Sequence, residues 1–398
     1  MTLPVSPLAL PKLAVPKLER DALLADAAKA AGLSDFGDPG FEAGLAVLLE
    51  SYAKESRLTP LGRQLVHDEL VGDLVGRLQV VDQLKRNPSL RSAKLGRTVF
   101  ILGLPRTGST TLQQMLQQDP DTQVLEYWLG VCPQPRPPRA TWERDPRYQQ
   151  VAEVLRLTYE KDPGLRALHD VSADGPGECR FVFRHLFMDD SYDHTATLPS
   201  YRAWFDAQPM DRVYAWYRDV LALIQQPTPE RRWALKYPPH LRCLKEIFAA
   251  FPDACVIHAH RDPAKVIPSY ASLLAHFTAV YEDDVDPKAI GRFSLELLAG
   301  RIEKGMRDRA ALGREDRFFD LHFREVLADP AGAVERALRR FGLSVSDEGL
   351  ARMREWHRAH PAGRHGRHDY TPEQYGLAPR ELSERFRGYR ERFGIPEE

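Results

Sequence analysis

The chain has 398 residues, 43% of them hydrophobic, and carries 55 Lys and Arg against 56 Asp and Glu. That length predicts two domains or one large α/β domain, and the balanced charge disfavours a nucleic-acid coat or a polybasic membrane-adhering protein. The sequence starts without a charged segment followed by an apolar one, and no apolar run approaches the ~18–20 residues that span a bilayer, so we expect a cytoplasmic protein without a transmembrane segment.

Residues 1–95 are predicted to form an N-terminal arm and a helical layer. Residues 1–20 contain four prolines, which favour an extended arm over a helix. From Asp21 to about Leu84 apolar residues recur at helical spacing, which predicts about three helices. The segment 85–89 ends this layer because Pro88 pushes the preceding residue out of the helical region.

Residues 96–398 alternate between short apolar runs and helical periodicity. The runs cover residues 98–102, 232–235, 254–259 and 318–322. Helices that follow buried strands indicate a parallel sheet, with ligands at the carboxyl ends of its strands. The predicted fold is therefore α/β, a P-loop-type parallel sheet flanked by helices, with the N-terminal helical layer added to it.

Residues 120–232 form a less regular insertion in this α/β domain. Between Tyr127 and Trp233 the chain has 16 of its 37 aromatic residues and five of its six tryptophans. Two interpretations remain open: the aromatic side chains line an apolar acceptor pocket, or they only anchor an irregular segment to the core.

The first apolar run leads into a glycine-containing loop and then into a helix with an apolar face. The sequence there is Gly103-Leu104-Pro105-Arg106-Thr107-Gly108-Ser109-Thr110-Thr111. A loop between a buried strand and a helix presents backbone N–H groups to a phosphate. We therefore expect the segment Arg106–Thr111, with the side chains of Thr107, Ser109, Thr110 and Thr111, to bind phosphate.

The loop differs from that of a nucleotide triphosphatase. Ser109 stands where the Walker A motif requires lysine, and the positive charge is Arg106 instead. No predicted strand ends in a plausible Mg²⁺-binding aspartate. These differences favour a donor that transfers a less charged group without Mg²⁺, over the alternatives of a P-loop kinase using ATP or a non-catalytic nucleotide-binding protein.

The loop Pro105–Thr111 resembles the 5′-phosphosulfate loop of sulfotransferases that use 3′-phosphoadenosine-5′-phosphosulfate (PAPS). Arg261 and Ser269, eight residues apart, resemble the family's pair for the 3′-phosphate. Residues 98–393 are most similar to the bacterial branch of this family, which also has a helical N-terminal layer.

Two further segments are similar to parts of the same family. Phe323 begins an element whose aromatic residue lies near the adenine in the family, where tyrosine is usual. Arg364 and Arg367 belong to a basic segment that resembles the one closing over the 3′-phosphate. The histidines of that segment have no Cys or Asp partner at ligand spacing, so no metal is expected.

Sulfuryl transfer requires positive charge on the bridging oxygen and a base for the acceptor proton. Arg106 and Lys236 are the candidate cations. Glu126, 20 residues after Arg106, resembles the catalytic glutamate of tyrosylprotein and bacterial glycolipid sulfotransferases, whereas His240, four residues after Lys236, resembles the histidine base of cytosolic members. Both bases remain open, and Glu126 is favoured.

The resemblance implies a PAPS-dependent sulfotransferase that acts on a hydroxyl group of a small-molecule or lipid-like acceptor. It implies no nucleic-acid partner and leaves homo-oligomerisation open.

Overall fold

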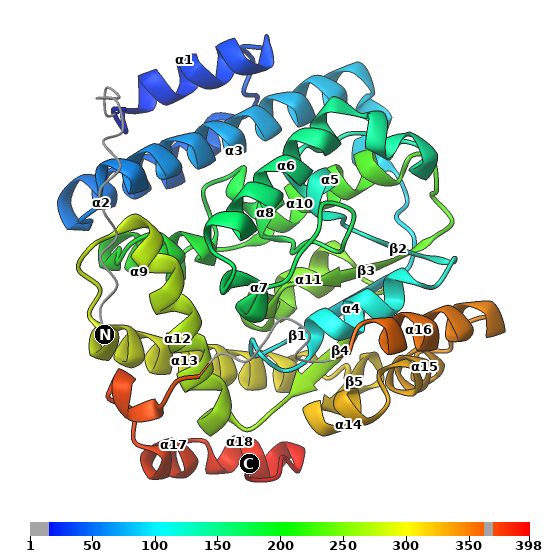
Figure 1. Cartoon of the computed structure of the whole chain (residues 1–398). Helices are drawn as coiled ribbons and strands as arrows, with labels where there is room; N and C mark the ends of the chain where they lie inside the picture. The colour runs from blue at the N-terminus through cyan, green and yellow to red at the C-terminus, as the bar shows by residue number, and fades with distance from the viewer. Residues whose placement is uncertain (1–15, 362–368) are drawn as a thin grey trace.

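The computed structural model describes residues 16–361 and 369–398, with a parallel sheet at its centre (Figure 1). The strands are β1 (Thr98–Gly103), β2 (Thr122–Val124), β3 (Arg232–Lys236), β4 (Cys255–His260) and β5 (Phe318–His322). They lie in the order β2-β3-β1-β4-β5, and each neighbouring pair is parallel. The predicted α/β fold is confirmed, because the four apolar runs form β1, β3, β4 and β5.

The register of the sheet brings the carboxyl ends of three strands to one edge. Ile101 of β1 lies beside Lys236 of β3, and Gly103 of β1 lies beside Ala259 of β4. The segments that follow these strands therefore begin next to one another, as expected for a ligand site in a parallel sheet.

Helices cover both faces of this sheet. Val99 and Ile101 of β1 belong to a hydrophobic cluster on one face, which α4 (Ser109–Gln117), α15 (Pro330–Arg340) and α16 (Asp347–Ala359) complete. Phe100 and Leu102 belong to a larger cluster on the other face. The alternation of side chains along a strand explains why β1 is buried over its whole length.

The N-terminal layer consists of three helices, α1 (Arg20–Ala31), α2 (Glu42–Glu55) and α3 (Pro60–Arg86), as predicted. Pro60 occupies the first turn of α3, and the Thr59 side chain accepts a hydrogen bond from the Gly62 N–H as its N-cap. Apolar residues of all three helices share one cluster with Phe100 and Leu102, so the layer is part of the core. Most of the predicted arm, residues 1–15, lies outside the described residues.

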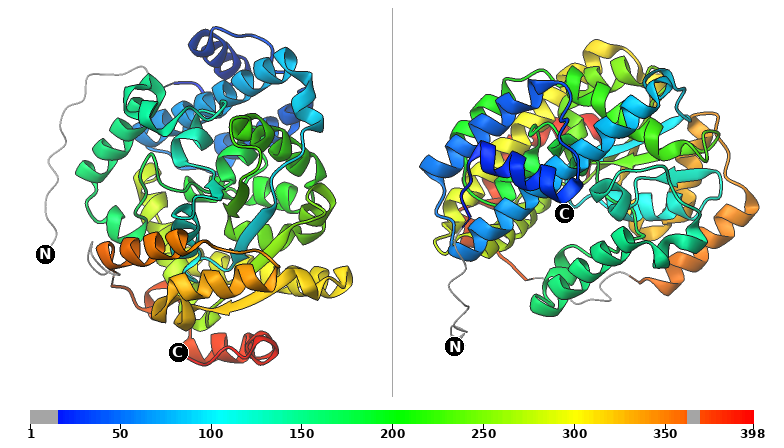
Figure 2. Two further views of the ribbon diagram at one scale, coloured as in Figure 1. Left: turned by 90° about the vertical axis from the view of Figure 1, so that its right-hand side faces the viewer. Right: turned by 90° about the horizontal axis from the view of Figure 1, so that it is seen from above.

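The insertion between β2 and β3 is built of short helices packed beside the N-terminal layer. They are α5 (Tyr127–Val131), α6 (Pro146–Lys161), α7 (Leu165–Leu168), α8 (Arg180–Arg184), α9 (Pro199–Asp206) and α10 (Asp211–Gln225). Only Val151 and Tyr159 of α6 are buried, and this helix lies at the periphery of the molecule (Figure 2).

The remaining helices follow β3, β4 and β5. They are α11 (Leu244–Ala250), α12 (Pro263–Tyr281), α13 (Pro287–Leu312), α14 (Phe323–Ala328), α17 (Pro379–Arg385) and α18 (Arg387–Phe393). None of the described helices is both long and apolar enough to cross a membrane.

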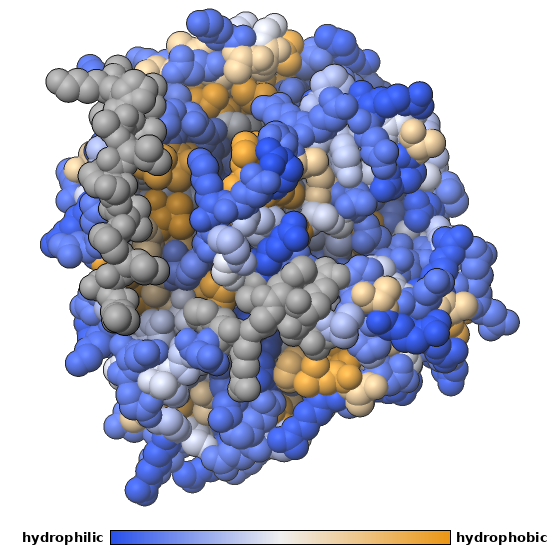
Figure 3. Space-filling view, in the orientation of Figure 1, coloured by the Kyte–Doolittle hydropathy of each residue, from blue (hydrophilic) through white to orange (hydrophobic). Residues whose placement is uncertain are grey.

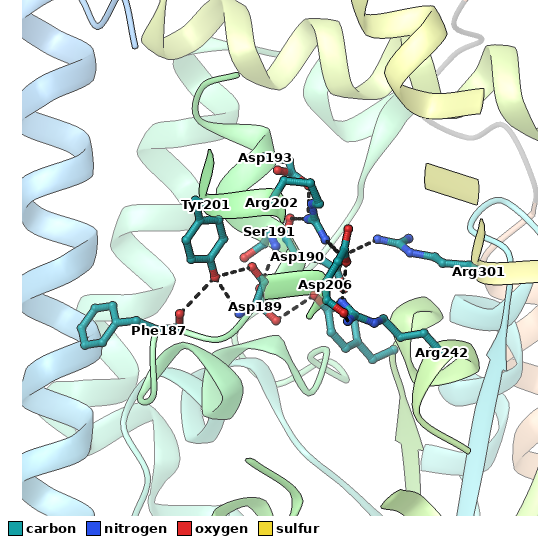
Figure 4. Close-up of polar contacts among 11 residues, drawn as sticks. Phe187, Asp189, Asp190, Ser191, Asp193, Tyr201, Arg202, Asp206, Arg242 and Arg301 are labelled. Carbon is teal, nitrogen blue, oxygen red and sulfur yellow. Dashed lines mark hydrogen bonds and ion pairs between the residues drawn. The ribbon is translucent and has the colours of Figure 1, made fainter. Parts of the chain in front are cut away.

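A buried network of charged side chains fixes α9 and α13 near the end of the sheet (Figure 4). Asp190 accepts hydrogen bonds from Arg202 of α9 and Arg301 of α13, each at 2.7 Å. Burial opposes ionisation of Asp190, but the two guanidinium groups hold the pKa of its carboxyl below the usual range. Breaking such a buried pair leaves an uncompensated charge, so the network holds these elements in one arrangement.

Candidate active site

The loop between β1 and α4 has the backbone conformation of an anion cradle. Gly103, Arg106 and Gly108 have φ angles of +133°, 63° and 81°, and the Thr107 hydroxyl donates to the Leu104 carbonyl at 2.8 Å. Ser109 begins α4, so backbone N–H groups of the loop and of the first helical turn converge there. Thr110 and Thr111 are partly exposed in the same turn.

Three of the residues predicted to bind the donor, Arg106, Arg261 and Ser269, line one cavity of about 1080 Å³. Arg106 donates from Nε to the Ser269 hydroxyl at 3.3 Å. Arg261 donates from Nη1 to the Arg106 carbonyl at 3.1 Å. The loop, the end of β4 and α12 thus present their polar groups to the same space.

Phe323 is the first residue of α14, and it lies next to Arg261 and the loop. The Arg261 guanidinium stacks on its ring at 4.2 Å from the centroid, and the ring lies close to Gly108. Arg364 and Arg367 lie outside the described residues.

Lys236 is buried at the carboxyl end of β3, and its Nζ donates to Glu178 Oε1 at 2.7 Å. Burial by itself raises the pKa of Glu178, but the charges of Lys236, His169 and Arg180 lower it to about 2. Glu178 is therefore an ionised carboxylate in contact with one of the two predicted cations.

The pKa of His169 depends both on the charges of this ion pair and on the charge of Arg106 in the loop. Burial and the positive charges of Lys236, Arg180 and Arg106, against the opposing charge of Glu178, together lower the pKa of His169 to about 4. Arg106 also donates to the carbonyl of Leu168 at 2.9 Å. Arg106, Lys236 and Glu178 thus surround one region at the end of β1 and β3.

Glu126 does not contact Lys236. Its Oε2 accepts from Arg136 Nη2 at 3.0 Å and from Arg136 Nε at 3.3 Å, and both side chains are buried. Arg136 also donates to the carbonyl of Val124, so the pair fixes the end of β2. That Glu126 acts as the base stays a prediction; its carboxylate is paired with the Arg136 guanidinium.

His240 is a core residue. It is 0% exposed, its Nδ1 lies 2.6 Å from the Tyr214 hydroxyl, and its ring packs edge-on against Phe100 and Phe183. Burial lowers the pKa of His240 to about 3. That His240 acts as the base also stays a prediction, although its ring is buried in the core.

In the sequence, Glu178 is a carboxylate at the start of a predicted helix, which could line the acceptor pocket or interact with the helix dipole, and it was not predicted as the base. The signal nearest to it is the Gly175-Pro176-Gly177 segment, which turns the chain immediately before Glu178. The Gly177 N–H donates to the carbonyl of Leu125, and the Cys179 N–H donates to the carbonyl of Lys236. These backbone bonds place Glu178 beside the end of β3.

Aromatic and cationic side chains lie near Glu178. Tyr127 packs edge-on against Phe181 at 4.7 Å, and His194 stacks on Phe277 at 5.3 Å. Arg180 contributes a positive charge nearby, because it is among the charges that act on Glu178, Tyr127 and His194. In Figure 3 the surface below α3 is hollowed and partly hydrophobic.

Among the described residues, His258, His260 and Asp320 form the group whose atoms are close enough to hold a metal ion. Asp320 accepts from Arg309 at 2.6 and 2.9 Å, and Arg309 also lies 3.3 Å from His258 Nδ1. This guanidinium supplies the positive charge that a cation would bring, so the group does not fit a metal centre. That the reaction uses no metal stays a prediction.

The comparisons of this chain with known proteins agree with one another. Residues 98–347 match the model of a family described as the sulfotransferase family. The crystal structure of sulfotransferase STF1 from Mycobacterium tuberculosis H37Rv is similar with a TM-score of 0.85 and 34% identity, covering 93% of this chain and 98% of that one.

Two further relatives cover much of the chain. Sulfotransferase STF9 from Mycobacterium avium has a TM-score of 0.87 and 29% identity, covering 96% of this chain and 98% of its own. Omega-hydroxy-beta-dihydromenaquinone-9 sulfotransferase Stf3 from Mycobacterium bovis is 25% identical over 293 residues, which are 70% of this chain and 71% of that protein.

Proposed function

The chain belongs to the sulfotransferase family, and from this premise we propose that it transfers a sulfuryl group from PAPS to a hydroxyl group of a lipid-like acceptor. The observation that carries the donor assignment is the meeting of Arg106, Arg261 and Ser269 at one cavity beside the loop. Neither the family nor the site supports the alternatives of an ATP-dependent kinase or a non-catalytic binding protein. The cytoplasm remains the predicted location.

In this proposal the loop binds the 5′-phosphosulfate and the end of β4 binds the 3′-phosphate. Backbone N–H groups from Thr107 to Thr111 and the Arg106 guanidinium face the 5′ side. Arg261 offers a planar fork of donors to a phosphate dianion, and the Ser269 hydroxyl adds a donor from α12. Phe323 supplies an aromatic surface near the adenine.

The transfer itself uses Lys236 and Glu178. The bond between sulfur and the bridging phosphate oxygen breaks while a bond between sulfur and the acceptor oxygen forms. Lys236 and Arg106 stabilise the negative charge that develops on the bridging oxygen. Glu178 accepts the acceptor proton, because it is the carboxylate in contact with Lys236.

The proposed acceptor is apolar because aromatic side chains lie near Glu178 and large hydrophobic side chains are exposed on the surface. Val154 and Leu157 are exposed on α6, and Leu61 and Val280 are exposed at the ends of α3 and α12. Such a distribution suits a ligand with a hydrocarbon chain. The name of the relative Stf3 gives that protein omega-hydroxy-beta-dihydromenaquinone-9, a hydroxylated menaquinone, as its acceptor.

The donor assignment is tested by titration calorimetry and by turnover. Adenosine 3′,5′-bisphosphate should bind without Mg²⁺ and more tightly than ATP or 5′-AMP. Radiolabelled PAPS should transfer its label to long-chain primary alcohols in preference to short, polar ones. Mg²⁺-dependent ATP binding that exceeds bisphosphate binding would instead support a kinase.

A further inference from the structure

The segment that follows α18 lies along the wall of the donor cavity. Ile395 is buried, the Glu398 N–H donates to Asp262 Oδ2 at 3.1 Å, and Arg324 donates to the carbonyl of Glu397 at 3.3 Å. Residues 395–398 are thus attached to the start of α12 and to α14. These contacts hold residues 395–398 beside Arg261.

The Glu398 carboxylate bonds to the arginine that is proposed to bind the 3′-phosphate. Arg261 donates from Nε to Glu398 Oε2 at 3.1 Å, while its Nη1 donates to the carbonyl of Arg106. The side chains of Arg261 and Glu398 are 23% and 17% exposed, and both line the cavity that Ser269 lines. A carboxylate therefore already occupies the Nε end of the donor fork that a phosphate would use.

Three other carboxylates on this wall bond to different groups. Glu397 accepts from Ser383 at 2.7 Å, and Glu384 accepts from Arg380 at 3.2 Å. Asp262 caps the start of α12 by accepting from the Ala264 N–H. Glu398, in contrast, bonds to the Arg261 side chain itself.

We propose that Glu398 is a specificity-determining residue, which competes with the 3′-phosphate of the donor for Arg261. The inference rests on the proposed function, because it presumes that Arg261 binds this phosphate. Two anions do not share one guanidinium edge without repulsion, so the phosphate must displace the carboxylate or bind beside it. Either outcome weakens the binding only of nucleotides that carry a 3′-phosphate. Weaker binding also promotes release of the bisphosphate product.

The test compares Glu398→Gln with the matched control Glu384→Gln, which removes the same charge from the same cavity wall. Calorimetry without Mg²⁺ measures the Kd of adenosine 3′,5′-bisphosphate and of 5′-AMP for the full chain. In Glu398→Gln the bisphosphate should bind roughly 5- to 30-fold more tightly, the range typical of a coupling between two sites, while 5′-AMP changes less than about 2-fold. The gain should shrink as salt is added.

Three results would overturn the inference while leaving the donor assignment intact. They are bisphosphate affinity that is unchanged or weaker in Glu398→Gln, an equal gain for 5′-AMP, and an equal gain in Glu384→Gln. Failure of the donor assignment looks different, because then the parent protein itself does not distinguish bisphosphate from 5′-AMP.

Discussion

Lys236 and Glu178 are in contact at the end of β3, and a substitution that removes the negative charge of Glu178 tests the role of the carboxylate. Glu178→Gln keeps the shape of the side chain but removes the proton acceptor. We expect kcat to fall by ~10²–10⁴-fold, the usual scale for a general base. The Kd for adenosine 3′,5′-bisphosphate, measured by calorimetry, should stay within about 2-fold, because Glu178 does not line the donor cavity.

Glu126→Gln is the matched control on the other buried carboxylate. It weakens a charge-assisted bond to Arg136, which costs ~1.5–3 kcal/mol of the free energy of unfolding. Denaturant titration should detect this loss, and kcat of the folded fraction should remain near that of the parent. A large drop in kcat at unchanged stability would instead indicate that Glu126 is the base.

The pH dependence of kcat/KM follows from the low pKa of Glu178, about 2 in the free protein. A base with a lowered pKa stays ionised as the pH falls, so kcat/KM should remain level between pH 8 and about pH 5 as far as this group is concerned. The acid limb should appear only below about pH 4. Half-maximal loss near pH 6.5, the ordinary pKa of histidine, would point to a different base.

Residues at the site were predictable where a local motif defines them. The loop and Arg261 were predicted to lie at one site because each follows a buried strand, and Ser269 because it lies on the helix after Arg261. Glu178 was not predicted as the base, since a count of residues from Arg106 gives no direction for a side chain. Glu126 and Glu178 lie on adjacent backbone segments, joined by a bridge between Glu126 and Pro176, yet one carboxylate bonds Arg136 and the other Lys236.

Among the elements, β1 and the loop after it depend on a glycine at their junction. A Cβ at Gly103 would lie 2.3 Å from the carbonyl oxygen of Ala259 in β4, at a φ of +133°. Gly103→Ala should therefore lower the free energy of unfolding by about 2–5 kcal/mol, the sum of backbone strain and overpacking. Gly300→Ala in α13, where a Cβ meets nothing within 4 Å, should instead be neutral or raise it by ~0.5–1 kcal/mol. Thermal unfolding of the two variants distinguishes these effects.

The elements themselves were mostly predictable from periodicity. Continuous apolar runs indicated four strands, and helical spacing indicated the N-terminal layer. The strand β2 was not predicted, because Thr122-Gln123-Val124 is short and mixed in character. Its Gln123 side chain donates to the carbonyls of Thr228 and Arg231, contacts that depend on the folded insertion.

On the scale of the whole molecule, the N-terminal layer and the insertion share buried charges. Arg184 of α8 donates to Glu69 at 2.8 Å and to Asp73 at 2.9 Å, both on α3. Removal of residues 1–95 would leave this buried guanidinium without its partners, which costs ~3–5 kcal/mol, and would also expose the apolar cluster beneath. A chain of residues 96–398 should therefore show no cooperative transition in calorimetry. A sharp transition would mean that the α/β domain folds alone.

The position of β1 between β3 and β4 also affects the motion of the loop that follows it. Its amide groups are bonded within the sheet on both sides, whereas β2 and β5 are edge strands. Backbone amides of β1 should therefore exchange with solvent deuterium more slowly than those of β2, which lies at an open edge. The loop emerges from this slowly exchanging strand, so its N–H groups are already ordered before an anion arrives. Little conformational entropy is then lost when the anion binds.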